Sequence, residues 1–345
     1  MIPMCEVTIG VPVYRSVKYI EASLLSALNQ TFQDVEFLIV DDAGNDGSMD
    51  VVASLQRNHP RGDKIRILVN SKNMGVSYSR NRIIEEAKGR YLYFMDSDDT
   101  IESNTIQLLY EAIIHNHTQI AYGSYDIVDI LDNSPKQLYQ KETSVLRGND
   151  VLAIYAFKNI HIFHVSVCNH LVSLDFLRQS NVRFINTPFW EDMAYTIDLV
   201  TKVESAVMLS NITYHYLRHS GSLSHYQNRK TIEKEEIMKN VSVLDILKDK
   251  SKQYRGKDYL PYLCCILETN SFYVICYIIR NSKQIHPHFS VNEMRSIMCC
   301  PFSLIEILSF KRKKIANVGF AILSILPTFI FIPVLKLLGR IKKVL

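Results

Sequence analysis

The sequence predicts an α/β fold, with a mostly parallel sheet flanked by helices, for its first 125 residues. Strand-like and helical apolar patterns alternate there, the order that produces parallel strands joined by helical crossovers. The run Tyr91–Met95 is apolar throughout, as in a strand covered on both faces of such a sheet. No Gly-x-Gly-x-x-Gly or Gly-x-x-x-x-Gly-Lys motif is present, so neither a dinucleotide fingerprint nor a P-loop is predicted.

Each element of this alternation has its own signal. Apolar residues alternate or cluster in the strands, and they recur every three or four positions in the helices. Pro12 ends the first strand, a turn rich in Gly, Asn and Asp follows the second, and Lys88-Gly89 ends the third helix. The expected strands are 6–12, 35–40, 65–69 and 91–95, and the expected helices are 19–29, 48–57, 77–87 and 105–116.

The rest of the chain is organised differently. Residues 126–225 are less regular, and we expect them to form the second half of a domain over 1–225 whose first half is 1–125. Residues 226–310 predict a helical extension, and 311–345 form a basic, apolar tail. The seven cysteines are odd in number and lack Cys-x-x-Cys spacing, which indicates reduced thiols in a cytoplasmic protein. The chain also opens directly into a strand pattern, without the features of a signal peptide.

Charge is concentrated in the tail. Residues 311–345 hold eight Lys or Arg and no Asp or Glu, whereas the whole chain has a net charge of +4. This pattern favours an anionic membrane surface over nucleic acid. The stretch 315–335 carries no charge and reaches the length of a membrane span, although Pro327 and Pro333 weaken it. An interfacial or re-entrant anchor is the favoured interpretation, and a true span or a buried helix pair are the alternatives.

Three carboxylates follow the strand at 91–95. Asp96, Asp98 and Asp99 carry like charges that repel one another, so they lie together readily only if they are solvated or share a cation. Mg²⁺ and Mn²⁺ prefer carboxylate oxygens and often bring a phosphate with them. Open α/β sheets bind ligands at this end of their strands. The alternative is an Asp-rich turn before a helix that Thr100 or Ser103 would cap.

Six short motifs stand in order along the N-terminal half. They are Val11-Pro12-Val13-Tyr14, Asn29-Gln30-Thr31-Phe32, Ile39-Val40-Asp41-Asp42, Asn73-Met74-Gly75, Ser79-Arg80-Asn81 and Phe94-Met95-Asp96-Ser97-Asp98-Asp99. Together they resemble the family 2 glycosyltransferases, which are inverting, nucleotide-sugar-dependent enzymes with the GT-A fold, a Rossmann-like sheet. The resemblance covers residues 5–125 and continues more loosely to 225.

The resemblance implies a nucleotide site. It places Pro12, Val13 and Tyr14 beside the nucleotide, and it makes Asp42 the acceptor of the uracil imide N–H. Arg80 would contact the nucleotide or its phosphates, and Asn73 would shape a loop near the nucleobase. Each role has a structural alternative: Pro12 ends a strand, Tyr14 packs, Asp42 caps a turn and Arg80 lies on a solvated helix face. These residues stand at the positions of the family's motifs.

The resemblance also implies a metal and a base. Asp98 would hold Mn²⁺ or Mg²⁺, and Asp96 would touch the ribose or the metal with its water. Asp192 matches the family's general base, and the start of a helix at 193–203 would favour its ionised form. The alternative is that Glu191 and Asp192 are ordinary first-turn helix acids. Further candidates near the diphosphate or acceptor are His215, Arg218, Ser222 and Ser224.

The function that follows is transfer of a sugar, with inversion, from a nucleotide-diphosphate donor to a glycan or lipid-linked acceptor. The family favours a UDP-sugar. The tail, together with the resemblance, suggests bacterial surface polysaccharide synthesis on the cytoplasmic face of the cell membrane. Two other functions would use a similar nucleotide-binding site. A nucleotidyltransferase would need a Gly-rich, basic N-terminal loop in place of Pro12-Val13-Tyr14, and a non-catalytic membrane-bound nucleotide-sugar binder would bind without turnover.

Overall fold

The computed structural model describes residues 4–129, 137–163, 167–187, 190–219 and 231–344. The chain divides into two compact units, Met1–Ser222 and Leu223–Leu345. The predicted limit at residue 225 falls among residues outside this description and stays a prediction. The tail that begins at residue 311 belongs to the second unit.

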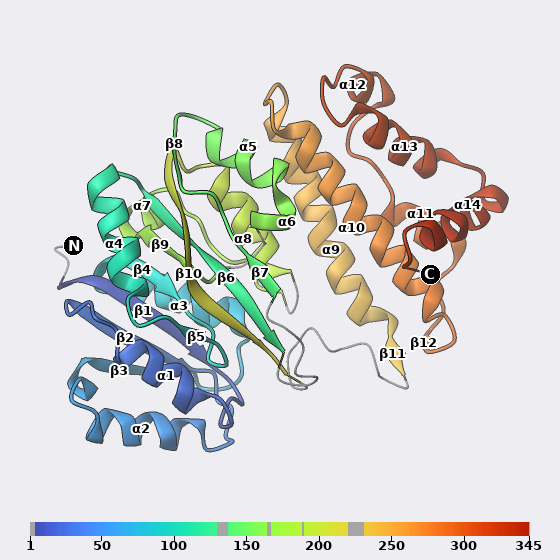
Figure 1. The fold of residues 1–345 in the computed structure, drawn as a ribbon. Coiled ribbons are helices and arrows are strands. Elements are labelled where there is room, and N and C mark those ends of the chain that lie inside the picture. Colours follow the sequence, from blue (N-terminus) through green and yellow to red (C-terminus); the bar gives the residue numbers. More distant parts are fainter. Residues whose placement is uncertain (1–3, 130–136, 164–166, 188–189, 220–230, 345) are drawn as a thin grey trace. The chain divides into compact units, whose positions relative to one another are not determined.

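In the first unit, the described residues form one mixed sheet with helices on its faces (Figure 1). Its strands are β1 (Cys5–Val13), β2 (Val35–Asp41), β3 (Ile65–Val69), β4 (Gly89–Phe94), β5 (Thr100–Ile101), β6 (Ile120–Asp129), β7 (Gln137–Tyr139), β8 (Ser144–Arg147), β9 (His170–Ser173) and β10 (Ser205–Arg218). Its helices are α1 (Ile20–Leu28), α2 (Ser48–Asn58), η1 (Gly62–Lys64), α3 (Val76–Glu86), α4 (Thr105–Asn116), α5 (Val151–Lys158), α6 (Ile160–Phe163), α7 (Leu174–Gln179) and α8 (Glu191–Val200).

The order of the strands positions the site. The sheet runs β3-β2-β1-β4-β9-β6-β10-β5, and the first four strands are parallel. The chain leaves β1 on one side to make β2 and β3, then returns to its other side as β4. This reversal is a topological switch point, where open α/β sheets bind ligands at the carboxyl ends of the strands. The predicted α/β fold is confirmed, while β10 and the last four residues of β6 lie in the region 126–225 that the sequence leaves irregular.

Close packing holds the helices to these strands. Gly10 lies where α3 crosses β1, and a Cβ there would collide with Ile83 Cγ2. On α8, the ring of Tyr195 stacks on Phe184, with centroids 4.1 Å apart, and Phe184 meets Phe94 of β4 edge-on at 5.7 Å. Phe94 and Tyr195 are both almost fully buried. These contacts fix the start of α8 against the end of β4.

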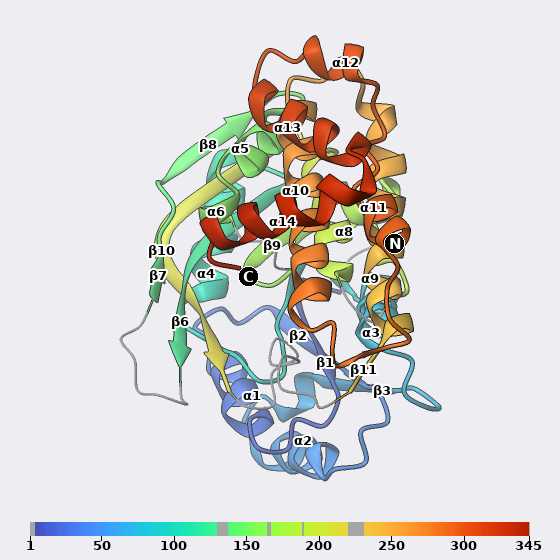
Figure 2. The ribbon, with the colours of Figure 1, turned by 90° about the vertical axis from the view of Figure 1, so that its right-hand side faces the viewer.

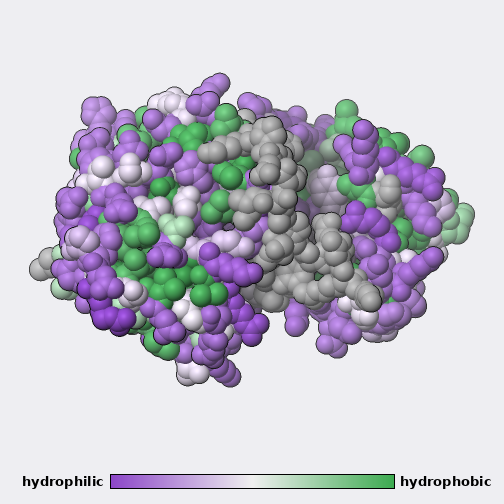
Figure 3. Space-filling view, turned by 60° about the horizontal axis from the view of Figure 1, so that its bottom comes forward, coloured by the Kyte–Doolittle hydropathy of each residue, from purple (hydrophilic) through white to green (hydrophobic). Residues whose placement is uncertain are grey.

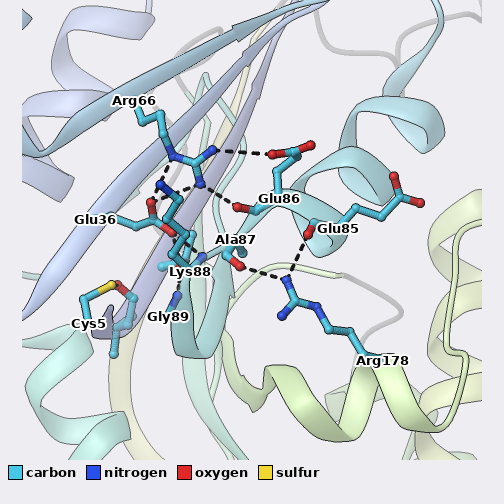
Figure 4. A network of polar contacts seen from close by, with 11 residues as sticks. Cys5, Glu36, Arg66, Glu85, Glu86, Ala87, Lys88, Gly89 and Arg178 are labelled. Carbon is cyan, nitrogen blue, oxygen red and sulfur yellow. Dashed lines mark hydrogen bonds and ion pairs between the residues drawn. The ribbon is translucent and has the colours of Figure 1, made fainter. Parts of the chain in front are cut away.

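A polar network fixes the other end of β4 (Figure 4). Arg66 of β3 pairs with Glu36 of β2 at 3.2 Å and reaches Glu86 at the end of α3 at 3.8 Å. Arg178 of α7 donates to the carbonyl oxygens of Glu85 and Ala87 at 3.0 and 2.8 Å. The turn from α3 into β4 is thereby tied to two strands and one helix.

The second unit is mainly helical. Its elements are β11 (Ile232–Glu233), α9 (Lys234–Ser251), η3 (Lys252–Tyr254), α10 (Leu260–Arg280), β12 (Ile285–His286), α11 (Val291–Ile297), α12 (Leu304–Leu308), α13 (Lys314–Ile325) and α14 (Thr328–Ile341). The predicted helical extension is therefore present. The stretch 315–335 is not one helix, because α13 ends before Leu326-Pro327 and α14 begins after it.

Within the described residues, α10 is the one helix long and apolar enough to cross a membrane. Of its most apolar window, 61% is buried inside the protein. Glu268 on α10 is almost fully buried and pairs with Lys248 of α9 at 3.2 Å. Lys248 Nζ also donates to the carbonyl oxygens of Ile297 and Cys299. These are features of a helix in the core of a unit.

Candidate active site

The predicted site residues gather at the carboxyl edge of the parallel strands. Tyr14 follows β1, Asp42 follows β2 and Asp96 follows β4. Because β1 pairs with both β2 and β4 in parallel, these three ends lie side by side at the switch point.

The end of β1 offers an aromatic ring to solvent. Val13 is buried, and its carbonyl oxygen accepts from the N–H of Asp42 at 2.9 Å. Pro12 is half-buried, whereas Tyr14 is 41% exposed, with the Arg15 guanidinium carbon 5.2 Å from its ring centroid. An exposed ring beside a cation is suited to stacking on a base.

Asp42 organises the loop before α3. Its carboxylate is buried and accepts from Asn70 Nδ2 at 2.7 Å and from the backbone N–H groups of Met74 and Gly75 at 2.8 and 2.9 Å. Asn73 is exposed, and its Oδ1 also accepts from the Gly75 N–H. Gly75 has φ +89°, a conformation that favours glycine. Asp42 thus shapes this loop, and its contact with a nucleobase stays a prediction.

The aspartates after β4 have different environments. Asp99 is buried, accepting from the Tyr214 hydroxyl at 2.6 Å and from the Leu217 N–H at 2.8 Å. Burial, together with the charges of Asp96 and Asp98, raises the pKa of Asp99 well above its usual range. The side chains of Asp96 and Asp98 are 31% and 34% exposed. Asp99 therefore anchors the loop, while the other two carboxylates can meet a ligand.

Those two carboxylates fit a hard divalent cation. Burial and the neighbouring charge of Asp96 raise the pKa of Asp98, so a cation between them would relieve repulsion. In the described parts of the chain, no group of three or more His, Cys, Asp or Glu side chains is arranged to hold a metal ion. Mg²⁺ and Mn²⁺ commonly take one or two carboxylates and complete their coordination with phosphate and water. The prediction that Asp98 and Asp96 hold the cation agrees with this chemistry and is not tested by it.

His219 is a site residue that sequence reasoning missed. Its Nε2 lies 2.9 Å from Asp98 Oδ2, and its ring stacks on Tyr19 with centroids 4.0 Å apart. The histidine singled out from the sequence, His215, lies instead between Asp126 and Glu102, at 2.7 and 3.0 Å. No signal separates the two histidines, because both belong to the same hydroxyl-rich run. Ser222 and Ser224 lie outside the described residues, and Arg218 pairs with Asp129 at 3.4 Å.

Arg80 joins the two sides of the site. Its side chain is only 6% exposed, so it does not lie on a solvated helix face. One terminal nitrogen meets Asp96 Oδ1 at 2.8 Å and the other meets Glu191 Oε1 at 3.0 Å. Its guanidinium carbon lies 5.5 Å from the Phe184 ring centroid. Arg80 therefore connects the carboxylates after β4 to the first residue of α8, and its contact with phosphate stays a prediction.

Asp192 is the second residue of α8, directly after Glu191. It is half-buried, and its Oδ1 accepts from the Met193 N–H at 2.7 Å. Burial, and next the charge of Glu191, raise the pKa of Asp192 to about 7. The Met193 N–H at the helix start lowers this pKa as expected, but desolvation and a like charge outweigh it, so the net shift is upward. A carboxyl with a pKa near 7 is suited to take a proton at neutral pH.

Comparisons with known proteins identify the family of this chain. The sequence model of "Glycosyl transferase family 2" matches residues 8–179, about half of the chain. An uncharacterized glycosyltransferase of Haemophilus influenzae is 26% identical, over 61% of this chain and 78% of its own. The putative teichuronic acid biosynthesis glycosyltransferase TuaG of Bacillus subtilis is 25% identical, over 63% and 81%.

A solved structure extends the likeness to the whole fold. The crystal structure of S. aureus TarS 1-349 in complex with UDP-GlcNAc matches with a TM-score of 0.61 and 17% identity, covering 92% of this chain and 90% of that one. The chain spans a smaller share of some other matching glycosyltransferases, between 17% and 62% of their length. From the family match and the shared GT-A fold, the chain belongs to glycosyl transferase family 2 and is a glycosyltransferase.

Proposed function

We propose that this glycosyltransferase moves a sugar from a uridine diphosphate donor to a glycan or lipid-linked acceptor, inverting the anomeric centre, in the synthesis of a bacterial surface polysaccharide. The observation that supports the proposal is the chain of contacts from Asp96 through Arg80 to Glu191, whose neighbour Asp192 has a pKa raised to about 7. The complex of TarS with UDP-GlcNAc supports the donor, and the name of TuaG supports the pathway class.

The residues divide the reaction between them. Asp192 takes the proton of the acceptor hydroxyl as its oxygen bonds to the anomeric carbon, while the bond from that carbon to the diphosphate oxygen breaks and its electron pair leaves with the diphosphate. Asp98 and Asp96 would hold Mn²⁺ or Mg²⁺, which neutralises charge on the leaving diphosphate when it is bound. Tyr14 covers the nucleobase, and Asp42 holds the loop before α3 in place for the nucleotide.

A screen of nucleotide sugars tests the donor and the metal together. We expect one UDP-sugar to raise the melting temperature only with Mn²⁺ or Mg²⁺, because a ligand that binds only the folded state stabilises it. Asp98→Asn should remove this shift, whereas Asp63→Asn in η1, away from the carboxyl edge, should keep it. A shift that EDTA leaves unchanged would contradict the role of Asp98.

Activity assays with different substrates separate the alternative functions. A sugar transferred to acceptor in the presence of the cation supports the transferase. Release of pyrophosphate from a nucleoside triphosphate and a sugar phosphate would identify a nucleotidyltransferase instead. Donor binding without transfer or hydrolysis, across a panel of lipid-linked and glycan acceptors, would identify a non-catalytic binder.

The pKa of Asp192 gives a pH prediction. Because only the deprotonated carboxylate accepts a proton, kcat/KM should rise about tenfold per pH unit below pH 7 and level off above it. Glu191→Gln removes a charge that raises this pKa, so the rising limb should move to lower pH. The measurement is kcat/KM from pH 5 to 9 at saturating metal. A profile that is flat from pH 5 upward, or one that Glu191→Gln does not move, would remove Asp192 from this role.

A further inference from the structure

The C-terminal helices α13 and α14 expose many large apolar side chains. Ile315 is 91% exposed, Phe329 77% and Ile341 67%. The exposed apolar side chains of the two helices are Ile315, Ile322, Ile325, Phe329, Ile330, Leu337 and Ile341. Figure 3 shows hydrophobic residues at the right-hand edge, where α14 lies in Figure 1, intermingled with hydrophilic ones. Large apolar side chains exposed together on one part of a surface, bordered by polar ones, are a feature of interaction sites.

Helical spacing explains why these side chains point outward. On α14, Phe329, Pro333 and Leu337 recur every four positions on the exposed face. The opposite face carries Phe331 and Leu335, which are fully buried in the unit. Figure 2 shows α14 lying across the front of α10. Packing within the unit thus explains the apolar residues on the inner face of α14. It does not explain the apolar residues on the outer face.

The charges beside this face have one sign. Lys336 and Arg340 are exposed and lie, by helical spacing, along the edge of the apolar face of α14. Lys311, Arg312 and Lys313 precede α13, Lys314 is its first residue, and Lys342 and Lys343 follow α14. No Asp or Glu occurs from residue 311 to the end. An apolar stripe bordered by cations is complementary to the acyl boundary and headgroups of an anionic bilayer.

The lengths of the helices favour an orientation along the membrane. With 12 and 14 residues, α13 and α14 extend about 18 and 21 Å at 1.5 Å per residue. Either helix is too short for a hydrocarbon core of about 30 Å. The break at Leu326-Pro327 prevents them from continuing as one helix.

We propose that the outward faces of α13 and α14 dock on an anionic membrane surface, with Phe329, Leu337 and Ile341 at the acyl boundary and Lys336 and Arg340 at the headgroups. This surface belongs to the second unit, whereas the predicted donor-binding residues belong to the first, and it would hold the enzyme where a lipid-linked acceptor is found. The proposal does not depend on the identity of the sugar.

Sedimentation of the full chain with vesicles tests the docking. The protein should partition onto vesicles of one part phosphatidylglycerol to three parts phosphatidylcholine more strongly than onto phosphatidylcholine alone, and 0.5 M NaCl should weaken this binding. Lys336→Gln with Arg340→Gln should lower the partition coefficient roughly 30-fold, since each basic residue near such a surface contributes about fivefold. The matched control, Lys239→Gln with Lys283→Gln, removes two exposed lysines of the same unit, one on α9 and one between α10 and β12, and should change the partition coefficient little.

The apolar face is tested separately. Phe329→Ser with Leu337→Ser should reduce partition onto both kinds of vesicle, and an unchanged circular dichroism spectrum would show that the variant folds. If that variant misfolds, the two charge variants decide the question. Alkaline carbonate should release the wild type from vesicles.

Three results would overturn the proposal. Equal binding to anionic and neutral vesicles would remove the role of the basic residues, and resistance to carbonate would indicate a span. Self-association that the serine variant abolishes, without vesicle binding by the wild type, would assign the face to a second copy of the chain. Transfer to a soluble acceptor should be unaffected by all of these variants, so failure here is distinguishable from failure of the proposed reaction.

Discussion

Replacing Asp192 with asparagine should lower kcat by roughly 10²–10⁴-fold, the usual contribution of a positioned general base. Asparagine has nearly the same shape and can still accept from the Met193 N–H at the start of α8. It cannot take the proton of the acceptor hydroxyl. Transfer from the donor identified by thermal shift, followed at saturating acceptor, measures the loss.

Donor affinity separates a base from a binding residue. Asp192→Asn should leave the Kd for the donor within a few-fold of the wild type, because the predicted nucleotide contacts lie at the carboxyl ends of β1, β2 and β4, on α3 and in the loop before α3, and not on α8. Asp175→Asn is a matched control, since Asp175 is also the second residue of its helix, α7, but is exposed. A large loss of donor binding in Asp192→Asn, or full activity, would reassign this residue.

Replacing Arg80 with methionine should be the most destabilising single change in the site. Removing one partner of a buried ion pair costs roughly 3–5 kcal/mol, because the other charge stays buried and uncompensated. Since Asp96 is 31% exposed, solvent screens part of this cost, and we expect about 3 kcal/mol with loss of transfer. Chemical denaturation at pH 8 measures the change in the free energy of unfolding.

Two variants test whether geometry or charge matters at this position. Arg80→Lys keeps the charge but lacks the planar fork that reaches Asp96 and Glu191 together, so it should recover only part of the stability and little of the activity. Arg66→Met breaks the pair with Glu36, where both side chains are partly exposed, and should cost about 1 kcal/mol or less with activity retained. An Arg80→Met enzyme with wild-type stability would show that the network contributes little.

The sequence predicts local features well. The strand at 65–69 and the helix at 105–116 have the bounds expected of them, because each carries a complete apolar pattern between clear turn signals. The carboxyl ends of β1, β2 and β4 also meet as expected, since parallel pairing alone brings Tyr14, Asp42 and Asp96 to one edge. Periodicity and motif order are enough for these results.

Contacts between distant segments are what the sequence does not provide. Arg80 and Glu191 are 111 residues apart, and nothing in either local pattern indicates that one guanidinium serves both Glu191 and Asp96. The contact of His219 with Asp98 spans 121 residues. The pKa of Asp192 is likewise set by burial and by Glu191, so the helix position alone predicts the wrong direction.

The position of Arg80 has a consequence for attempts to redesign this enzyme. One guanidinium pairs both with Asp96, which is predicted to face the nucleotide, and with Glu191, which precedes the proposed base Asp192. A substitution chosen to admit a different sugar nucleotide near Asp96 would therefore shift Arg80, and with it the acidity of Asp192. Laboratory evolution of a new donor preference should accumulate compensating changes around α8, even when selection acts on the donor alone.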